Sequence, residues 1–261
     1  MNQPVSIILP NYKTPELTRL CLRSLRKYTT HDAIRIIAVD NASGDESAEY
    51  LRSLGWIRLI ERTPADIDGM APALMHTTAM DLALKEVDTP FVLSFHTDTI
   101  VYSPDWLDFL LGKFSDAPKL AGVGSWKLEH VSRAKMIGQR IEDFFRETFT
   151  RRRHAPEERY LRSHCACYRT EPVKTLTRGF DDNETAGKSL HRMLVAAGWE
   201  MRFLDSAELG RYVDHLNHAT MILNPSGSGR TSKASSRRKL DGKLDNPYYR
   251  HLLENDALDK L

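Results

Sequence analysis

The tripeptide His96-Thr97-Asp98 directly follows the run Phe91-Val92-Leu93-Ser94-Phe95, in which every residue but one is apolar. Such a run is typical of a strand that is buried on both faces of a sheet. Ligands of open parallel sheets bind outside the carboxyl ends of the strands, so a side chain just past such an end lies where chemistry takes place. Asp98 has the type and position to bind a divalent metal ion there, although an isolated aspartate can also cap the next turn.

A second apolar run ends in the same way. The run 34–39 leads into Asp40, and the turn-forming segment 41–45 follows. Because the carboxyl ends of parallel strands meet at one edge of a sheet, we expect Asp40 and Asp98 at the same edge. A carboxylate after the second strand suits hydrogen bonding to a base or ribose, whereas one after a later strand suits a metal ion that binds a diphosphate. Mg²⁺ needs only one or two protein carboxylates, so Asp98 is sufficient in principle.

Strands and helices alternate along the first half of the chain. Apolar patterns predict strands over residues 5–9, 34–39, 57–60, 91–95 and 120–126, and helices over residues 15–28, 46–54 and 70–87, with another helix from about residue 103. We expect Pro10 to end the first strand, because proline cannot continue a central ladder. This alternation predicts an α/β fold with a mostly parallel, Rossmann-like central sheet flanked by helices.

The second half is less regular. We expect a strand within residues 160–168, a short strand over 201–204 and a final helix over about 246–258. The acidic segment 181–184 is expected to open a helix, where the helix dipole alone would favour it. The segment 225–239 is rich in glycine, serine and basic residues and is expected to be mobile.

Composition limits the class of protein. The chain has 261 residues, 41% of them hydrophobic and 28% charged, with a net charge of +2, which is ordinary for a globular protein with one large α/β domain or two small ones. The near-neutral charge gives no reason to expect a nucleic-acid partner. No apolar run approaches the roughly 20 residues that span a bilayer. We therefore expect a cytoplasmic location, which includes the inner face of the membrane if the basic segments bind there.

Three segments together resemble family 2 glycosyltransferases of the GT-A fold. They are Val5-Ser-Ile-Ile-Leu-Pro-Asn-Tyr-Lys13, Val39-Asp-Asn-Ala-Ser-Gly-Asp45 and His96-Thr-Asp-Thr99, and their order and spacing agree over about residues 4–126. The resemblance implies one GT-A domain with a nucleotide-sugar-binding half (1–126), a smaller acceptor-side half (127–225) and a basic loop with a C-terminal helix (226–261). It implies inverting transfer of a sugar from a nucleoside-diphosphate sugar to a carbohydrate or lipid-linked acceptor, with Mg²⁺ or Mn²⁺, in glycan or polysaccharide biosynthesis.

The resemblance also implies site residues. The residues expected to contact the donor are Pro10, Asn11, Tyr12, Asp40, Asp81, Thr97 and Arg230. The expected metal ligands are Asp98, His96 and His215, with His218 as an alternative to His215. The candidates for the general base are Glu184, Asp182 and Asp181.

Two positions depart from the family pattern. His96 stands where the family has the first aspartate of its Asp-x-Asp motif, and Asp81 stands where many members have the asparagine of Asn-x-Gly. The stretch from Ser226 to Lys243 is suited to a lid that brings Arg230 or Lys233 onto phosphate, and a solvated linker is the equal alternative.

Other functions remain open. A protein of the same fold that binds nucleotide sugars without catalysis is the main alternative, because His96 replaces an acidic residue. A sugar-1-phosphate nucleotidyltransferase or a dinucleotide-binding enzyme should carry a glycine-rich turn after the first strand, and residues 10–15 contain no glycine. An RNA-binding role for the basic runs 151–153 and 230–239 is disfavoured, because aromatic residues for base stacking are not interleaved there.

Overall fold

A seven-stranded sheet forms the centre of the protein, and its strands lie in the order β3-β2-β1-β4-β7-β6-β8. The computed structural model describes residues 5–126, 159–181, 185–216, 219–224 and 234–260. All neighbouring strands pair in parallel except β7, which is antiparallel to both β4 and β6. The strands are β1 (Val5–Asn11), β2 (Ile34–Asp40), β3 (Ile57–Glu61), β4 (Phe91–Phe95), β6 (Leu120–Gly124), β7 (Cys165–Arg169) and β8 (Glu200–Phe203). The prediction of a mostly parallel central sheet is confirmed.

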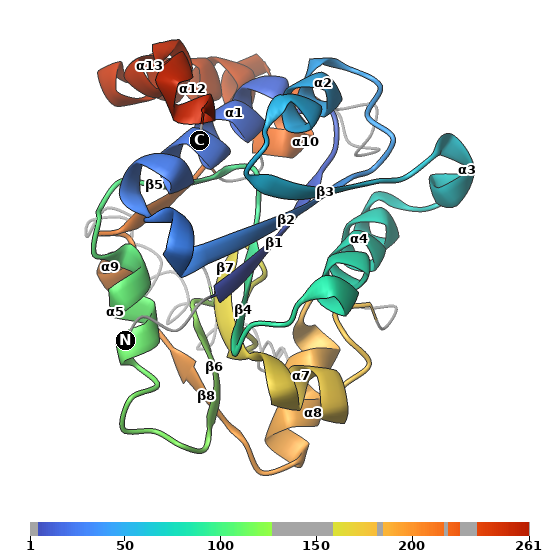
Figure 1. Ribbon diagram of the computed structural model, residues 1–261, viewed down its shortest axis with the longest axis vertical. Coiled ribbons are helices and arrows are strands. Elements are labelled where there is room, and N and C mark those ends of the chain that lie inside the picture. Colours follow the sequence, from blue (N-terminus) through green and yellow to red (C-terminus); the bar gives the residue numbers. More distant parts are fainter. Residues whose placement is uncertain (1–4, 127–158, 182–184, 217–218, 225–233, 261) are drawn as a thin grey trace, which may run out of the picture.

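Helices cover both faces of the sheet, as Figure 1 shows. One face packs against α1 (Pro15–Tyr28), α2 (Glu46–Ser53), α5 (Trp106–Gly112), α12 (Ala234–Leu244) and α13 (Pro247–Glu254). The opposite face packs against α4 (Pro72–Glu86), α7 (Thr170–Leu176) and α8 (Lys188–Ala196). The other helices of the described residues are the short α3 (Pro64–Ile67), α9 (Ser206–Leu209) and α10 (Ala219–Leu223) and the 3₁₀ turns His31–Ala33 and Asp256–Asp259.

The central strands are apolar throughout because both of their faces are buried. On β1, Val5, Ile7 and Leu9 pack into the core beneath α1, whereas Ile8 packs into the core beneath α4. Successive side chains of a strand point to opposite faces, so a strand between two helical layers needs apolar residues at every position. The same packing explains why the apolar runs in the sequence located these strands.

The first strand is longer than its proline indicated. β1 continues through Pro10 to Asn11, and Pro10 lies opposite Val39 of β2. On its other side β1 pairs with β4 only as far as Ile8. The expectation that Pro10 ends the strand was wrong. Beyond Ile8, β1 pairs with β2 alone, so the N–H that proline lacks is not needed for a ladder with β4.

Two expectations for the second half also need correction. Helix α8 begins at Lys188, so the segment 181–184 does not open it. The part of the expected mobile segment from Ala234 onward is helix α12, whose Leu240 and Leu244 are buried against the core. The rest of that segment, residues 225–233, lies outside the described residues.

The two halves of the chain share the sheet. Strand β7, from the second half, pairs with β4 and β6 from the first. A small second sheet joins β5 (Thr99–Val101) to β9 (Val213–His215) in antiparallel register. Neither three-residue strand was expected from the sequence, and together they bring the end of the second half to the carboxyl end of β4. No helix among the described residues is long and apolar enough to cross a membrane.

Candidate active site

The two-stranded β5/β9 sheet places His215 next to Asp98. After β4 the chain turns, with the Thr99 N–H donating to the His96 carbonyl at 3.1 Å, and enters β5. Thr99 lies opposite His215 in the ladder, and the Leu216 N–H donates to the Asp98 carbonyl at 2.8 Å. These backbone bonds fix His215 against the residue that follows the central strand.

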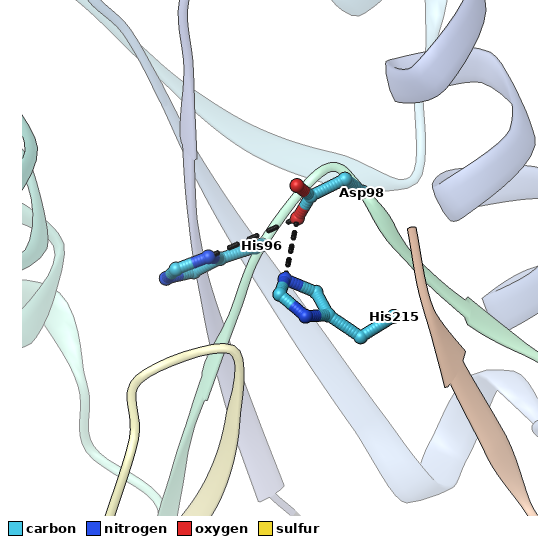
Figure 2. A group of neighbouring side chains, drawn as sticks. All are labelled: His96, Asp98 and His215. Atoms are coloured by element: carbon cyan, nitrogen blue, oxygen red, sulfur yellow. Dashed lines mark ion pairs between the residues drawn. The ribbon is translucent and has the colours of Figure 1, made fainter. Parts of the chain in front are cut away.

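Three potential metal ligands converge at this point (Figure 2). His215 Nε2 lies 3.2 Å from Asp98 Oδ1, and His96 Nδ1 lies 3.8 Å from the same oxygen. One ligand atom from each residue falls within a group spanning at most 4.8 Å. Oδ1 is buried and has no hydrogen-bond partner, so the imidazole nitrogens approach it without hydrogen-bond alignment. Ligands that each lie about 2.0–2.2 Å from one ion are roughly 3 Å apart, so the three side chains would hold a divalent metal after moving closer together by about 1 Å.

A serine orients the His96 ring. His96 Nε2 forms a hydrogen bond with Ser163 Oγ at 3.0 Å, which turns Nδ1 toward Asp98. A metal-binding histidine usually forms a hydrogen bond through its second ring nitrogen in this way, and the bond fixes both tautomer and orientation. The His96 side chain keeps 27% of its surface exposed, so the site stays open on this side.

Two further histidines surround the group. The His164 ring stacks on His215 with centroids 4.6 Å apart, and its Nε2 forms a hydrogen bond with Ser125 Oγ at 3.1 Å. The His76 ring, on α4, packs edge-on against His96 at 4.6 Å, and its Nε2 is buried with no hydrogen-bond partner. Four imidazoles from separate parts of the chain therefore surround Asp98.

Burial favours the neutral form of three of these imidazoles, those of His76, His96 and His164. It lowers the pKa of His76 to about 4 and lowers the pKa values of His96 and His164 well below the ordinary value. Burial acts in the opposite sense on Asp98, but the charge interaction with His215 outweighs it and the pKa of the carboxyl falls below its usual range. Metal binding requires an ionised carboxylate and neutral imidazoles, so the pKa shifts of Asp98 and His96 both favour it.

The loops after β1 and β2 are tied together by a buried polar network. Asn11 Nδ2 donates to Asp40 Oδ1 at 2.7 Å and to Ser47 Oγ at 2.9 Å, and Asn11 Oδ1 accepts from Thr18 at 2.6 Å. Asp40 also accepts from the Ser43 N–H at 2.9 Å and from Ser43 Oγ at 2.6 Å. The two side chains lie at the predicted edge and hold the loops. Their contact with a nucleotide stays a prediction.

The remaining donor-site candidates of the first half differ in exposure. Pro10 and Thr97 are buried, and Thr97 Oγ1 lies 3.4 Å from Thr14 Oγ1, which links the loops after β4 and β1. Tyr12 is half-buried, and the Lys13 ammonium lies 5.3 Å from the centre of its ring. Lys13 has a φ of 50°, a left-handed conformation that costs energy for a residue other than glycine. Strain of this kind is often kept at ligand-binding loops.

Asp81 fastens the loop that carries the acidic segment. Its carboxylate accepts the N–H groups of Phe180 at 2.7 Å and Asp181 at 2.9 Å, and Thr77 Oγ1 donates to Asp181 Oδ1 at 3.0 Å. Asp81 also borders a cleft of about 470 Å³ between β3 and α4, whose lining includes Arg62. A donor contact for Asp81 stays a prediction, while its observed partners belong to the acidic loop.

Several predicted residues lie outside the described residues. They are Asp182, Glu184, His218, Arg230 and Lys233. Of the acidic segment, only Asp181 is described. Since α8 has no acidic residue in its first turn, the helix dipole does not account for Asp181.

Sequence reasoning missed four residues that the fold brings to Asp98. They are His76, Arg162, Ser163 and His164. The Arg162 guanidinium lies over the Trp126 ring at 4.8 Å, and its charge is among the effects that lower the pKa of His96. Residues 162–164 precede an antiparallel strand, so they lie at the same edge where parallel strands end. The signal in the sequence was these three polar residues before an apolar run, but the strand's direction could not be known.

Comparisons with solved structures identify the fold as that of GT-A glycosyltransferases. A mannosyltransferase from Pyrobaculum calidifontis, PcManGT, solved with GDP-Man and Mn²⁺, superposes with a TM-score of 0.60 at 17% identity, over 98% of this chain and 76% of its own. S. aureus TarS 1–349 superposes with a TM-score of 0.53 at 13% identity, over 97% of this chain and 73% of its own.

The sequence defines the family. The model of glycosyl transferase family 2 matches residues 6–177, and the chain belongs to this family. Protein CgeD of Bacillus subtilis (strain 168) is 28% identical over 152 residues, which are 56% of this chain and 34% of that protein. The chain thus spans about a third of the length of that curated relative.

Proposed function

We propose that this protein transfers a sugar from a nucleoside-diphosphate sugar to an acceptor hydroxyl with inversion at the anomeric carbon, and that transfer depends on a divalent metal ion. The family supports glycosyl transfer itself. The observation that carries the finer proposal is the group formed by His96, Asp98 and His215 at the carboxyl end of β4. The similar mannosyltransferase, solved with GDP-Man and Mn²⁺, agrees with this choice of cofactor.

His96, Asp98 and His215 would hold the ion. When bound, it supplies positive charge to the diphosphate that leaves with the donor's nucleoside. The loops after β1 and β2 would bind the nucleoside half, with Tyr12 and Lys13 as the more exposed groups beside the network of Asn11 and Asp40. Arg162, close to His96, adds a second positive charge for the diphosphate.

The acidic loop would supply the general base. A carboxylate there takes the proton of the acceptor hydroxyl as its oxygen attacks the anomeric carbon, and the bond from that carbon to the diphosphate oxygen breaks. The candidates remain Asp181, Asp182 and Glu184. Asp81, on helix α4, binds the backbone N–H groups of Phe180 and Asp181, which supports a fixed start for this loop.

A donor screen tests the proposed reaction. The protein is mixed with UDP-, GDP- or dTDP-sugars, with and without Mn²⁺, and thermal stabilisation identifies the donor that binds the folded state. The cognate donor is then followed by proton NMR, alone and with candidate acceptors. Turnover should give the anomer opposite to that of the donor. Binding without turnover under all these conditions favours a non-catalytic nucleotide-sugar-binding protein, and retention of configuration contradicts an inverting mechanism.

Three variants identify the base. If Glu184 is the base, Glu184→Gln should keep the melting temperature and donor affinity while transfer falls by roughly 10²-fold or more. Asp182→Asn and Asp181→Asn are the matched controls, and loss of rate confined to one of them moves the role to that residue. Normal transfer in all three variants would remove the acidic loop from the mechanism.

A further inference from the structure

The candidate metal ligands His96, Asp98 and His215 offer mostly nitrogen atoms, whereas a cation such as Mg²⁺ prefers oxygen. Two of the three ligands are imidazoles, and only Asp98 offers an oxygen. Mg²⁺ prefers oxygen ligands in near-ideal octahedral geometry and is usually bound through one or two carboxylates together with substrate phosphates and water. Imidazole ligands suit Zn²⁺, Fe²⁺, Co²⁺ and similar ions. The donor set therefore favours a transition metal.

The ligands are also held in place without a substrate. His215 is fixed by the β5/β9 ladder, and Asp98 sits on the same ladder through the Leu216 N–H. Ser163 orients His96 through Nε2. Asp98 and His215 expose only 6% and 13% of their side chains, so little side-chain freedom remains to be lost when an ion binds.

The surrounding imidazoles strengthen this arrangement. His164 stacks on the ring of His215 and is itself fixed by two hydrogen bonds: Thr99 Oγ1 donates to its carbonyl at 3.1 Å, and its Nε2 bonds to Ser125 Oγ. His76 covers the ring of His96 edge-on. Each of the two ligand rings thus has a partner ring packed against it, which limits its movement.

We infer that this protein binds one divalent transition-metal ion at His96, Asp98 and His215 in the absence of nucleotide, and that it selects this ion against Mg²⁺. The inference deepens the proposed function, because it concerns the same site. It differs from metal binding that depends on the donor's phosphates, since the protein supplies three ligands and the ion is present before the donor arrives. Ser163 is the positioning residue that makes His96 a ligand through Nδ1.

Cobalt provides a readout that is independent of sugar transfer. Protein purified without a histidine tag is freed of metal with a chelator and titrated with Co²⁺ without nucleotide, and visible absorption reports the ligand field. We expect one Co²⁺ per chain and no displacement of Co²⁺ by a large excess of Mg²⁺. Mn²⁺ should displace Co²⁺ only when it is in excess, because it stands below Co²⁺ in the usual affinity order. Binding only after a nucleoside diphosphate is added, or displacement by Mg²⁺ at concentrations similar to those of Co²⁺, would overturn the inference.

Variants connect the signal to the site. His215→Ala and Asp98→Asn should abolish the Co²⁺ spectrum, and Ser163→Ala, which keeps all three ligands, should weaken binding by about 10- to 100-fold. His251→Ala removes an exposed imidazole from α13 and should bind as the unmodified protein does. Far-UV circular dichroism checks that each variant is folded. Unchanged Co²⁺ affinity in both His215→Ala and Ser163→Ala would refute the assignment.

The two proposals fail separately. Tight Co²⁺ binding without any donor turnover would contradict the proposed function and leave the metal inference intact. Donor turnover that proceeds in chelator, with no Co²⁺ spectrum, would contradict the metal inference and the metal dependence of the proposed reaction, and would leave glycosyl transfer itself intact.

Discussion

Replacing Asp40 with alanine should destabilise the fold even before any nucleotide is bound. The Asp40 carboxylate is 2% exposed and accepts three hydrogen bonds, from Asn11 Nδ2 at 2.7 Å, the Ser43 N–H at 2.9 Å and Ser43 Oγ at 2.6 Å. A hydrogen bond to a charged group contributes about 1.5–3 kcal/mol, and a buried donor that loses its acceptor keeps its desolvation cost.

The three bonds are not independent. Asn11 Nδ2 keeps Ser47 Oγ at 2.9 Å as an acceptor in the variant, and the Ser43 hydroxyl can rotate. The Ser43 N–H is the donor that loses its only side-chain acceptor. We therefore expect Asp40→Ala to lower the free energy of unfolding by about 2–4 kcal/mol, which is less than the sum of three charged hydrogen bonds.

Urea unfolding at pH 7, followed by tryptophan fluorescence, measures this loss as a lower midpoint at unchanged slope. Asp45→Ala is the matched control, because Asp45 is a half-buried aspartate of the same loop that caps α2 through the Ser47 N–H. Loss of a cap costs typically about 1 kcal/mol. A loss in Asp40→Ala no larger than that in Asp45→Ala would show that the buried network does not hold the two loops.

Gly179 has a φ of 96°, and an added Cβ would lie 2.3 Å from Asp81 Oδ1, so Gly179→Ala should cost more stability than Gly198→Ala, where φ is 86° and no atom lies within 4 Å of the added Cβ. Both variants pay roughly 1–2 kcal/mol for the left-handed backbone, so equal urea midpoints would contradict the clash. Burial raises the pKa of Asp259, but its hydrogen bonds, chiefly from Arg23, lower the pKa more, so it ends below the ordinary value. The resulting stability is present above the unfolded pKa of about 3.9 and is lost as the pH falls through the folded pKa, so Asp259→Asn should flatten the decline of urea midpoints below about pH 4.

The sequence predicted the parts of the fold that depend on local pattern. The helical spacing of Leu17, Leu20 and Leu25 located α1 at Pro15–Tyr28, and the apolar runs located the central strands. These predictions succeed because burial leaves a pattern in the sequence. A strand buried on both faces is a continuous apolar run, and a helix buried on one face has apolar residues at helical spacing. The position of Asp98 after β4 followed from the same trace.

The site itself depends on pairings that leave no such trace. His215 reaches Asp98 through β5 and β9, and three residues are too few to show an alternating pattern. His164 reaches the site because β7 runs antiparallel to its neighbours, and a single apolar run does not reveal its direction. The resemblance to a known family supplied His215 as a ligand, whereas Ser163, His164 and His76 could be found only from the folded chain.

The local energetics of the site also favour a binding role over a structural one. His76 Nε2 is buried without a hydrogen-bond partner, which costs about 1–3 kcal/mol, and no donor meets the buried Asp98 Oδ1 in hydrogen-bond alignment. A carboxylate kept only for stability would be saturated with donors, as Asp40 is by Asn11 and Ser43. Asp40 ends β2 and Asp98 follows β4, so both lie at the same edge of the sheet. The Asp40 carboxylate accepts three hydrogen bonds, whereas Asp98 Oδ1 faces imidazole nitrogens without hydrogen-bond alignment. This difference supports the proposal that Asp98 binds an external ligand with positive charge, whereas the hydrogen bonds of Asp40 hold the loops and its contact with a nucleotide stays a prediction.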